Sequence, residues 1–260
     1  MKGFFACLLA MFMITAMTAL GETVVEDSVA HSFECQGFES PEAAMAAYLE
    51  AMKAGDVQGM LATFAIETWV DAGDPQVFLE SRWTFIPNNV DGMGLPAGNP
   101  YVRAIAVNGR YSSLVNALYR QYLLYSWPEA YGAYTGEPLK LEGESDVESF
   151  LSALSASTFS TSLTGMEIAD FVDPATLSDM YLSETNQKTI ARQTSGYGCA
   201  EVQDVVVRLK LDGEEWYQCM WVGRYGEKWY NLKLGGNIGV LLGVDTYAGG
   251  LFPASSLHDE

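Results

Sequence analysis

Histidine, the side chain most often used as a general base, occurs in this chain of 260 residues only at His31 and His258. A Ser-His-Asp or Cys-His mechanism needs an imidazole that a packed scaffold holds against the nucleophile. His31 precedes the first predicted helix and His258 lies close to the C-terminus, so neither position predicts that support. Histidine-based zinc sites fail for the same reason. We therefore assign no catalytic residue and no zinc ligand.

Acidic residues are far more numerous, with 33 Asp and Glu in the chain, so chemistry by paired carboxylates stays open. The acidic cluster at Glu142, Glu144, Asp146 and Glu148 could be an acid/base pair of the kind that glycosidases use, or a metal site. The simpler interpretation is a loop followed by a helix start, where acidic side chains complement the helix dipole. No Asp-x-Asp-x-Asp-Gly calcium loop occurs. We expect no metal site and no cofactor.

Cysteine and glycine patterns also favour structure over chemistry. Beyond residue 21 the chain contains Cys35, Cys199 and Cys219, an odd number without a Cys-x-x-Cys motif, so a disulfide-rich scaffold or a zinc knuckle is not predicted. The glycine run at 235–239 lacks the Gly-Lys-Ser/Thr ending of a phosphate loop and the spacing of a dinucleotide-binding loop. Its glycines predict either close packing on a helix or a chain reversal after the last strand.

The C-terminal third has a period of two, which is typical of strands. Alternating apolar residues predict a strand at 205–211, and Asp212-Gly213 is a strong signal for a tight hairpin turn. The return strand is predicted from Glu214 to about Gly223, and a third strand over 228–234. The resulting register places Leu209 opposite Trp216 and Val205 opposite Met220. It also places Cys219 opposite Val206, which argues against a Cys199–Cys219 disulfide.

Aromatic side chains occupy both faces of this predicted three-stranded meander. One face must line the core. The second face is either covered by other elements or lines a cavity for an apolar or sugar-like ligand. The candidate ligand-binding residues are Tyr217, Trp221, Trp229 and Tyr230. Basic and aromatic residues do not interleave as they do in nucleic-acid-binding segments.

Helices are predicted before the strands. Ser40 caps a helix that continues through Pro41 and Glu42, and Asp56 caps a second, shorter helix. Three further pairs combine a capping residue with a first-turn proline, at 74–75, 99–100 and 173–174, and Ser145 with Glu148 forms a capping box. The region from about 75 to 190 is therefore predicted to be mostly helical, with Tyr111–Tyr125 as its longest element.

Helices followed by strands indicate an α+β fold in which N-terminal helices pack on a curved antiparallel meander. We predict a signal peptide over residues 1–21, an exposed leader over 22–39, and a single α+β domain over 40–260. A mostly helical elaboration of that domain covers residues 75–190.

The sequence from Ser40-Pro41-Glu42 through Tyr48-Leu49 to Ala54-Gly55-Asp56 resembles the opening helices of nuclear-transport-factor-two-like domains, the family that includes ketosteroid isomerase. The end of the predicted meander, Lys228-Trp229-Tyr230, is also similar to the last strands of that family. The resemblance implies a cone-like fold with a pocket between helices and sheet, and many similar members are exported bacterial proteins. The two matching pieces cover about 65 residues, and residues 70–195 have no counterpart in a standard member. Neither the isomerase's carboxylate base nor its tyrosine can be placed here by motif.

The N-terminus has the pattern of a secretory signal. Lys2 gives a positive start, residues 4–20 form an uncharged apolar run, and Ala19-Leu20-Gly21 puts small residues just before Glu22. An uncleaved membrane anchor is the alternative, but the run is slightly short for a span. A lipoprotein is disfavoured because Cys7 comes before the apolar run. We expect a secreted or extracytoplasmic protein without an integral membrane segment after cleavage.

The balance of 14 Lys and Arg against 33 Asp and Glu gives a net charge of −19. Such a surface repels nucleic acid and anionic membranes and favours cationic partners, unless it serves solubility alone. Three functions stay open: an exported non-catalytic domain that binds an unknown small molecule, a cell-envelope accessory protein that acts through protein contacts, and an enzyme that uses carboxylate and tyrosine chemistry in a cone cavity.

Overall fold

The computed structural model describes residues 32–74, 76, 99–126, 143–156, 165–211, 213–243 and 249–257. The helices are α2 (Pro41–Lys53), α3 (Val57–Ala62), α4 (Glu67–Ala72), α6 (Pro100–Ser126), α8 (Glu144–Ala156), α9 (Glu184–Tyr197) and α10 (Ile238–Leu241). The strands are β1 (Glu167–Val172), β2 (Glu201–Leu211), β3 (Glu214–Tyr225), β4 (Lys228–Leu234) and β5 (Leu251–Pro253). Three 3-10 turns complete the list: η4 (Pro174–Thr176), η5 (Asp179–Leu182) and η7 (Ala254–Leu257). The fold is α+β, as the sequence predicts.

The predicted caps position the first two helices. The Ser40 side chain accepts a hydrogen bond from the Ala43 amide at 3.1 Å, and Asp56 accepts one from the Gly59 amide at 2.9 Å. Each cap satisfies an amide that the first turn of a helix leaves without a partner. Capping in this way lets α2 turn its apolar stripe inward, where Tyr48 and Leu49 are fully buried.

The long helix α6 begins at the predicted start signal, Asn99-Pro100. Asn99 accepts hydrogen bonds from the amides of Tyr101 and Val102, so α6 runs over 27 residues from Pro100 and includes the predicted 111–125 segment. The Asp173-Pro174 signal produces only the 3-10 turn η4. Helix α8 begins at Glu144, one residue before Ser145, and therefore does not use Ser145 as its cap. Pro75 lies outside the described residues.

The sheet has the strand order β1-β2-β3-β4, and β5 pairs with the first part of β3. The predicted meander is confirmed: Leu209 pairs with Trp216 and Val205 with Met220. Strand β2 begins at Glu201, four residues before the predicted start. Strand β1 lies within the region 75–190, which the sequence predicts to be mostly helical, and it is a difference from that prediction. It pairs with β2 in antiparallel orientation and has a register shift between Ile168 and Asp170.

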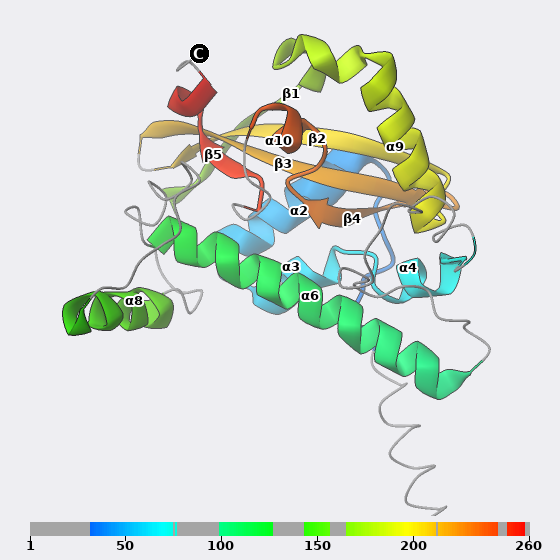
Figure 1. Ribbon diagram of the computed structural model, residues 1–260, viewed down its shortest axis with the longest axis horizontal. Coiled ribbons are helices and arrows are strands. Elements are labelled where there is room, and N and C mark those ends of the chain that lie inside the picture. The colour runs from blue at the N-terminus through cyan, green and yellow to red at the C-terminus, as the bar shows by residue number, and fades with distance from the viewer. Residues whose placement is uncertain are drawn as a thin grey trace, which may run out of the picture.

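The helices and the short outer elements cover opposite faces of this sheet. Figure 1 shows α6 below the strands, α2 behind them and α9 at one end. Helix α2 contacts β2, β3 and β4, and the main core lies there. A smaller cluster on the outer face joins Val206, Cys219, Ile238 and Phe252. The second face of the meander is therefore covered, which was one of the two predicted outcomes.

The N-terminal leader is partly buried along its described part, although Ser32, Gln36 and Glu39 are exposed. Phe38 and Trp229 form an antiparallel bridge with two hydrogen bonds of 2.9 Å, and Phe33 packs against the main core. The prediction of an exposed leader over 22–39 is therefore wrong for Phe33 and Phe38, because both side chains pack against the main core. Residues 1–31, which include the predicted signal peptide, lie outside the described residues.

Two further predictions concern the cysteines and the apolar character of the helices. Cys35, Cys199 and Cys219 form no disulfide, and Cys219 lies opposite Val206 as predicted. Among the described residues, no helix combines the length and the apolar character that a bilayer crossing requires.

Candidate functional site

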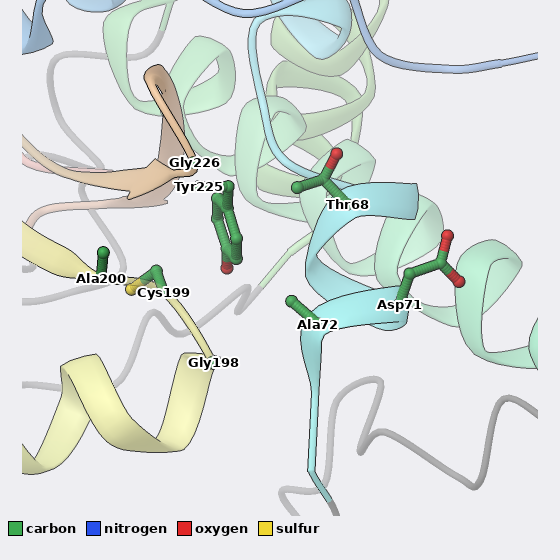
Figure 2. Close-up of a pocket in the computed structure, with 8 residues that line it drawn as sticks. All are labelled: Thr68, Asp71, Ala72, Gly198, Cys199, Ala200, Tyr225 and Gly226. Carbon is green, nitrogen blue, oxygen red and sulfur yellow. The ribbon is translucent and has the colours of Figure 1, made fainter.

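An open depression of about 660 Å³ lies where α4, the link from α9 to β2, and the turn from β3 to β4 meet. Figure 2 shows how these segments contribute its wall. The lining residues are Thr68, Asp71, Ala72, Gly198, Cys199, Ala200, Tyr225 and Gly226. Because it opens to solvent at the surface, it differs from the pocket between helices and sheet that the family resemblance implies.

The α9–β2 link reaches the depression through a left-handed glycine. Gly198 ends α9 with φ of 66°, the conformation in which helices often terminate. A Cβ atom at this position would lie 2.2 Å from the carbonyl oxygen of Ala72 at the end of α4. The close approach of these two backbones sets one side of the depression.

The Cys199 thiol and the Tyr225 hydroxyl in the wall of the depression are both protonated at neutral pH. Burial raises the pKa of the Cys199 thiol to about 11, so the nucleophilic thiolate is scarce at neutral pH. Burial also raises the pKa of Tyr225 well above its ordinary value, and its hydroxyl donates to the Tyr197 carbonyl oxygen at 2.9 Å. Neither group is therefore prepared for nucleophilic or general-base catalysis.

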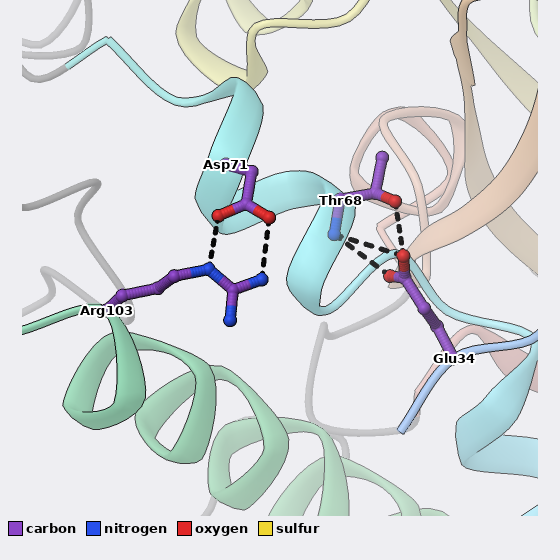
Figure 3. Close-up of polar contacts among 4 residues, drawn as sticks. All are labelled: Glu34, Thr68, Asp71 and Arg103. Atoms are coloured by element: carbon purple, nitrogen blue, oxygen red, sulfur yellow. Dashed lines mark hydrogen bonds and ion pairs between the residues drawn. The ribbon is translucent and has the colours of Figure 1, made fainter. Parts of the chain in front are cut away.

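Glu34 holds the start of α4 from a distant part of the chain. Its carboxylate accepts hydrogen bonds from the Ile66 amide at 2.7 Å and from the Thr68 amide at 3.1 Å, and the Thr68 hydroxyl also donates to it (Figure 3). A second contact joins the same two segments: the Glu67 carboxylate accepts a hydrogen bond from the Phe33 amide at 2.7 Å. Helix α4 has no capping side chain of its own, and Glu34 fills that role.

The environment of Glu34 pulls its pKa in two directions. Burial raises the pKa of the carboxyl, while the hydrogen bonds from Thr68 and Ile66 lower it, and the net shift is upward. A neighbouring carboxylate, Glu67, adds to the rise. Backbone amides donate to both oxygens of Glu34 and to Oε1 of Glu67, while Oε2 of Glu67 is buried without a hydrogen-bond partner among the described residues.

Asp71 is the acidic side chain of the depression wall. The Arg103 guanidinium from α6 donates to it twice, through Nε and Nη2, each at 2.6 Å (Figure 3). The Asp71 side chain remains 48% exposed despite this pair. A half-exposed bidentate pair mainly fixes geometry, and it orients α4 against α6.

A buried cation lies next to this pair along α6. Arg110 is only 8% exposed, and its guanidinium carbon lies 4.9 Å from the centre of the Trp69 ring on α4. Its Nη2 donates to the Leu232 carbonyl oxygen on β4. Arg110 thus ties α4 and α6 to the sheet beside the depression.

Glu34→Gln should lower the free energy of unfolding by about 1–2 kcal/mol, in the range measured when a helix loses a capping acceptor. The amide nitrogen of glutamine would face the Thr68 and Ile66 amides, which are also donors. Urea denaturation at neutral pH measures the change. Glu39→Gln is the matched control, because Glu39 is 84% exposed in its surface contact with Lys228. Equal losses in the two variants would rule out the capping role of Glu34.

A chain of buried polar side chains crosses the space between the helices and the sheet. Tyr48 on α2 donates to Gln121 on α6 at 2.5 Å, and Gln121 donates to Gln218 on β3. Gln218 then donates to the Gly249 carbonyl oxygen at 2.7 Å. All three side chains are at most 1% exposed. They link two helices and the sheet through the interior of the domain.

The four predicted ligand-binding residues do not come together in one place. Tyr217 packs on Phe252 in the outer cluster, and Trp221 is 4% exposed beside Tyr197. Trp229 bridges to Phe38, and Tyr230 lies close to Tyr225. None of the four belongs to the lining of the depression. Their role in ligand binding stays a prediction.

Sequence reasoning missed the residues that make the depression. Thr68 and Asp71 lie in a short helix that has no capping residue in the sequence before it. Their partners, Glu34 and Arg103, are more than thirty positions away along the chain. Gly198 had a detectable signal, since a glycine after the last helical residue is typical of a C-terminal cap. The predicted acidic cluster at 142–148 lies partly outside the described residues, and its described part forms the start of α8.

No family model and no curated protein matches this sequence. Among solved structures, the chain is similar to a cystatin-like protein from Ruminococcus gnavus ATCC 29149, with 12% identity and a TM-score of 0.42. The similarity covers 73% of this chain and 38% of that protein. This chain therefore matches well under two thirds of the length of that structure, and likeness of this degree assigns no function.

Proposed function

We propose that this protein is an exported, non-catalytic binding domain that engages its partner at the open depression between α4, the α9–β2 link and the β3–β4 turn. The observation that carries the proposal is the depression itself, which joins three separate segments at the surface. Export is supported by the signal-like pattern of residues 1–21, and the extracytoplasmic space is the proposed location.

The chemistry of the wall supports binding over catalysis. Burial keeps the Cys199 thiol and the Tyr225 phenol protonated at neutral pH, and Arg103 engages both oxygens of Asp71. Both histidines lie outside the described residues. Among the described lining residues, the Thr68 hydroxyl does donate to a carboxylate, that of Glu34, but the backbone amides of Ile66 and Thr68 also bind this carboxylate.

A cationic partner fits this protein best. The net charge of −19 produces a negative potential that draws cations toward the surface. Asp71 presents its half-exposed carboxylate in the depression, where a cation can share it with Arg103. The proposed partner is therefore a cationic small molecule or a basic segment of an envelope protein.

The test uses agmatine and a penta-arginine peptide as cationic probes, with succinate and penta-glutamate as anionic counterparts. We expect the cationic probes to shift the amide NMR signals of Thr68, Asp71, Ala72 and Ala200 in the exported protein, whose N-terminus mass spectrometry should place at Glu22. Ala200→Trp fills the depression and should weaken probe binding at least fivefold. The matched control is Ala169→Trp, because Ala169 is also exposed but lies on β1.

Two outcomes contradict the proposal. Shifts spread evenly over the acidic surface, with equal affinity in Ala200→Trp and Ala169→Trp, would mean that the probes bind only through the general charge. Anionic probes that bind as well as cationic ones would reject the partner chemistry. An N-terminus at Met1 in the purified protein would reject export with cleavage.

A further inference from the structure

A short segment of the outer face, residues 235–243, is fastened to the sheet by one buried acid. We name this segment the outer strap. Asp204 on β2 is 6% exposed, and its Oδ1 atom accepts hydrogen bonds from the Asn237 amide at 2.6 Å and the Ile238 amide at 3.1 Å. Asn237 also donates through its side chain to Asn186 on α9. The outer strap is thus held by specific polar contacts to the sheet and to α9.

Glycines in left-handed conformations stand at both ends of the outer strap. Gly235 and Gly236 have φ values of 89° and 56°, and Gly243 has φ of 69°. A Cβ atom at Gly236 would lie 2.2 Å from Oδ1 of Asp204, so the contact with the acid requires glycine there. Glycines with positive φ therefore lie on either side of the segment that the Asp204 carboxyl group binds.

The outer strap covers part of the apolar outer face. Ile238 is fully buried and packs in the cluster with Val206, Cys219 and Phe252. Tyr217, one of the predicted ligand-binding residues, packs against the same cluster. Movement of the outer strap away from the sheet would expose this apolar surface to solvent.

The Asp204 carboxyl group is poorly compensated for a buried charge. Its Oδ2 atom accepts no hydrogen bond of standard geometry among the described residues, and Nε1 of Trp221, the residue paired with Asp204 across the sheet, donates none. Burial raises the pKa of Asp204 to about 6, and interactions with the Ile238 and Asn237 amides and with the Trp221 and Tyr181 side chains only partly oppose this rise. Ionisation at neutral pH therefore places an unfavourable charge beneath the outer strap.

Both neutral and charged groups from the neighbouring elements lie near Asp204. From η5, Tyr181 has its pKa raised by burial and by Asp204, and Asp173 of η4 adds to that rise. From β3, Cys219 has its pKa raised by burial. Lys233 of β4 is the nearby cation, with its Nζ 5.7 Å from the centre of the Trp221 ring. Asn186 of α9 and Asn237 before α10 are uncharged.

We propose that the outer strap is a pH-dependent cover of the outer sheet face, closed when Asp204 is protonated and released more often when Asp204 is ionised. An exposed aspartate in the open form has the ordinary pKa of 3.8, lower than the value of about 6 in the closed form. The closed form thus binds the proton more tightly, and stability of closure is lost as the pH rises from about 4 through 6. From pH 5 to 7 the opening constant should rise about tenfold.

Native-state hydrogen exchange of the full protein tests this proposal, with rates converted to protection factors to remove the intrinsic pH effect. The reporting amides are those of Gly239, Leu241 and Leu242, which are hydrogen-bonded within the outer strap. Their protection should fall about tenfold from pH 5 to 7 and should not respond to low urea concentrations, as expected for local opening. Amides of α2 should be better protected and should respond to urea.

Asp204→Asn should remove the pH dependence of these three amides, and Asp170→Asn is the matched control. Asp170 is an exposed partner of Arg208 on β1, so its replacement should leave the dependence unchanged. Strap amides with the same protection as α2 would overturn the proposal, because the outer strap would then open only on global unfolding. Should Asp204→Asn fail to fold, carbon NMR of the Asp204 carboxyl in the unaltered protein decides. A midpoint near 6 supports the proposal and one below 4.5 overturns it.

Discussion

Gly198→Ala is expected to lower the free energy of unfolding by about 3 kcal/mol or more. The left-handed conformation of residue 198, with φ of 66°, costs an alanine about 1–2 kcal/mol. The added Cβ would also lie 2.2 Å from the Ala72 carbonyl oxygen, a backbone atom that cannot rotate away. Relief of that clash requires α4 and α9 to separate, and the burial of Trp69 against Tyr197 lies between them. Urea denaturation with a fixed slope measures the loss.

Substitutions at two other glycines distinguish the cost of the steric contact with Ala72 from the cost of a positive φ. Gly213 also has a positive φ, 86°, but nothing lies within 4 Å of a Cβ placed there, so Gly213→Ala should cost only about 1 kcal/mol. Gly109 lies inside α6 with open space around it, and Gly109→Ala should raise stability by about 0.5–1 kcal/mol. If Gly198→Ala and Gly213→Ala lose the same stability, the close contact between α4 and α9 does not exist.

Gln121→Leu should cost about 2–4 kcal/mol. The substitution keeps a side chain of similar size but leaves the Tyr48 hydroxyl and Oε1 of Gln218 without this partner inside the domain. Each buried polar group that loses its partner costs about 1–3 kcal/mol. Thermal and urea unfolding should agree on the loss, and the fold itself should persist because the apolar packing around α6 is unchanged.

A double-mutant cycle identifies the origin of this loss. Tyr48→Phe alone should cost about 1 kcal/mol, and the double variant Tyr48→Phe/Gln121→Leu should lose less than the sum by about 1 kcal/mol. The reason is that the two single substitutions remove the same hydrogen bond. If the losses in the free energy of unfolding were strictly additive, Tyr48 and Gln121 would not interact. The interior polar chain would then not stabilise the fold through this hydrogen bond.

The meander was predictable because short-range rules determine it. The tight turn at 212–213 fixes the pairing of β2 with β3, and alternation along β2 identifies the faces. The start of α2 was equally readable, since Ser40 and Pro41 act within a single turn. Strand β1 escaped prediction because it is an edge strand that buries little: four of its six residues are exposed, and Asp170 faces solvent in its pair with Arg208.

The candidate site was not predictable, because its contacts join distant parts of the chain. Glu34 caps a helix that starts 33 positions later at Glu67, and the contact of Gly198 with Ala72 depends on the packing of α9 against α4. Neither relationship leaves a local pattern. The same holds for Asp204, because the contacts that bury it come from the outer strap, more than thirty positions later in the chain.

Residues 33–38 and the chain around Phe64 together occupy the free side of β4. Phe38 exchanges two hydrogen bonds with Trp229, while Ala65 and Thr63 bond to Asn231 on the same strand. An open strand edge is a template for aggregation, since any extended chain can add to it. The protein thus supplies its own blocking segment at this edge. At β1, the other end of the described β1-β2-β3-β4 order, a bulge and the charges of Glu167 and Asp170 oppose the addition of a further strand.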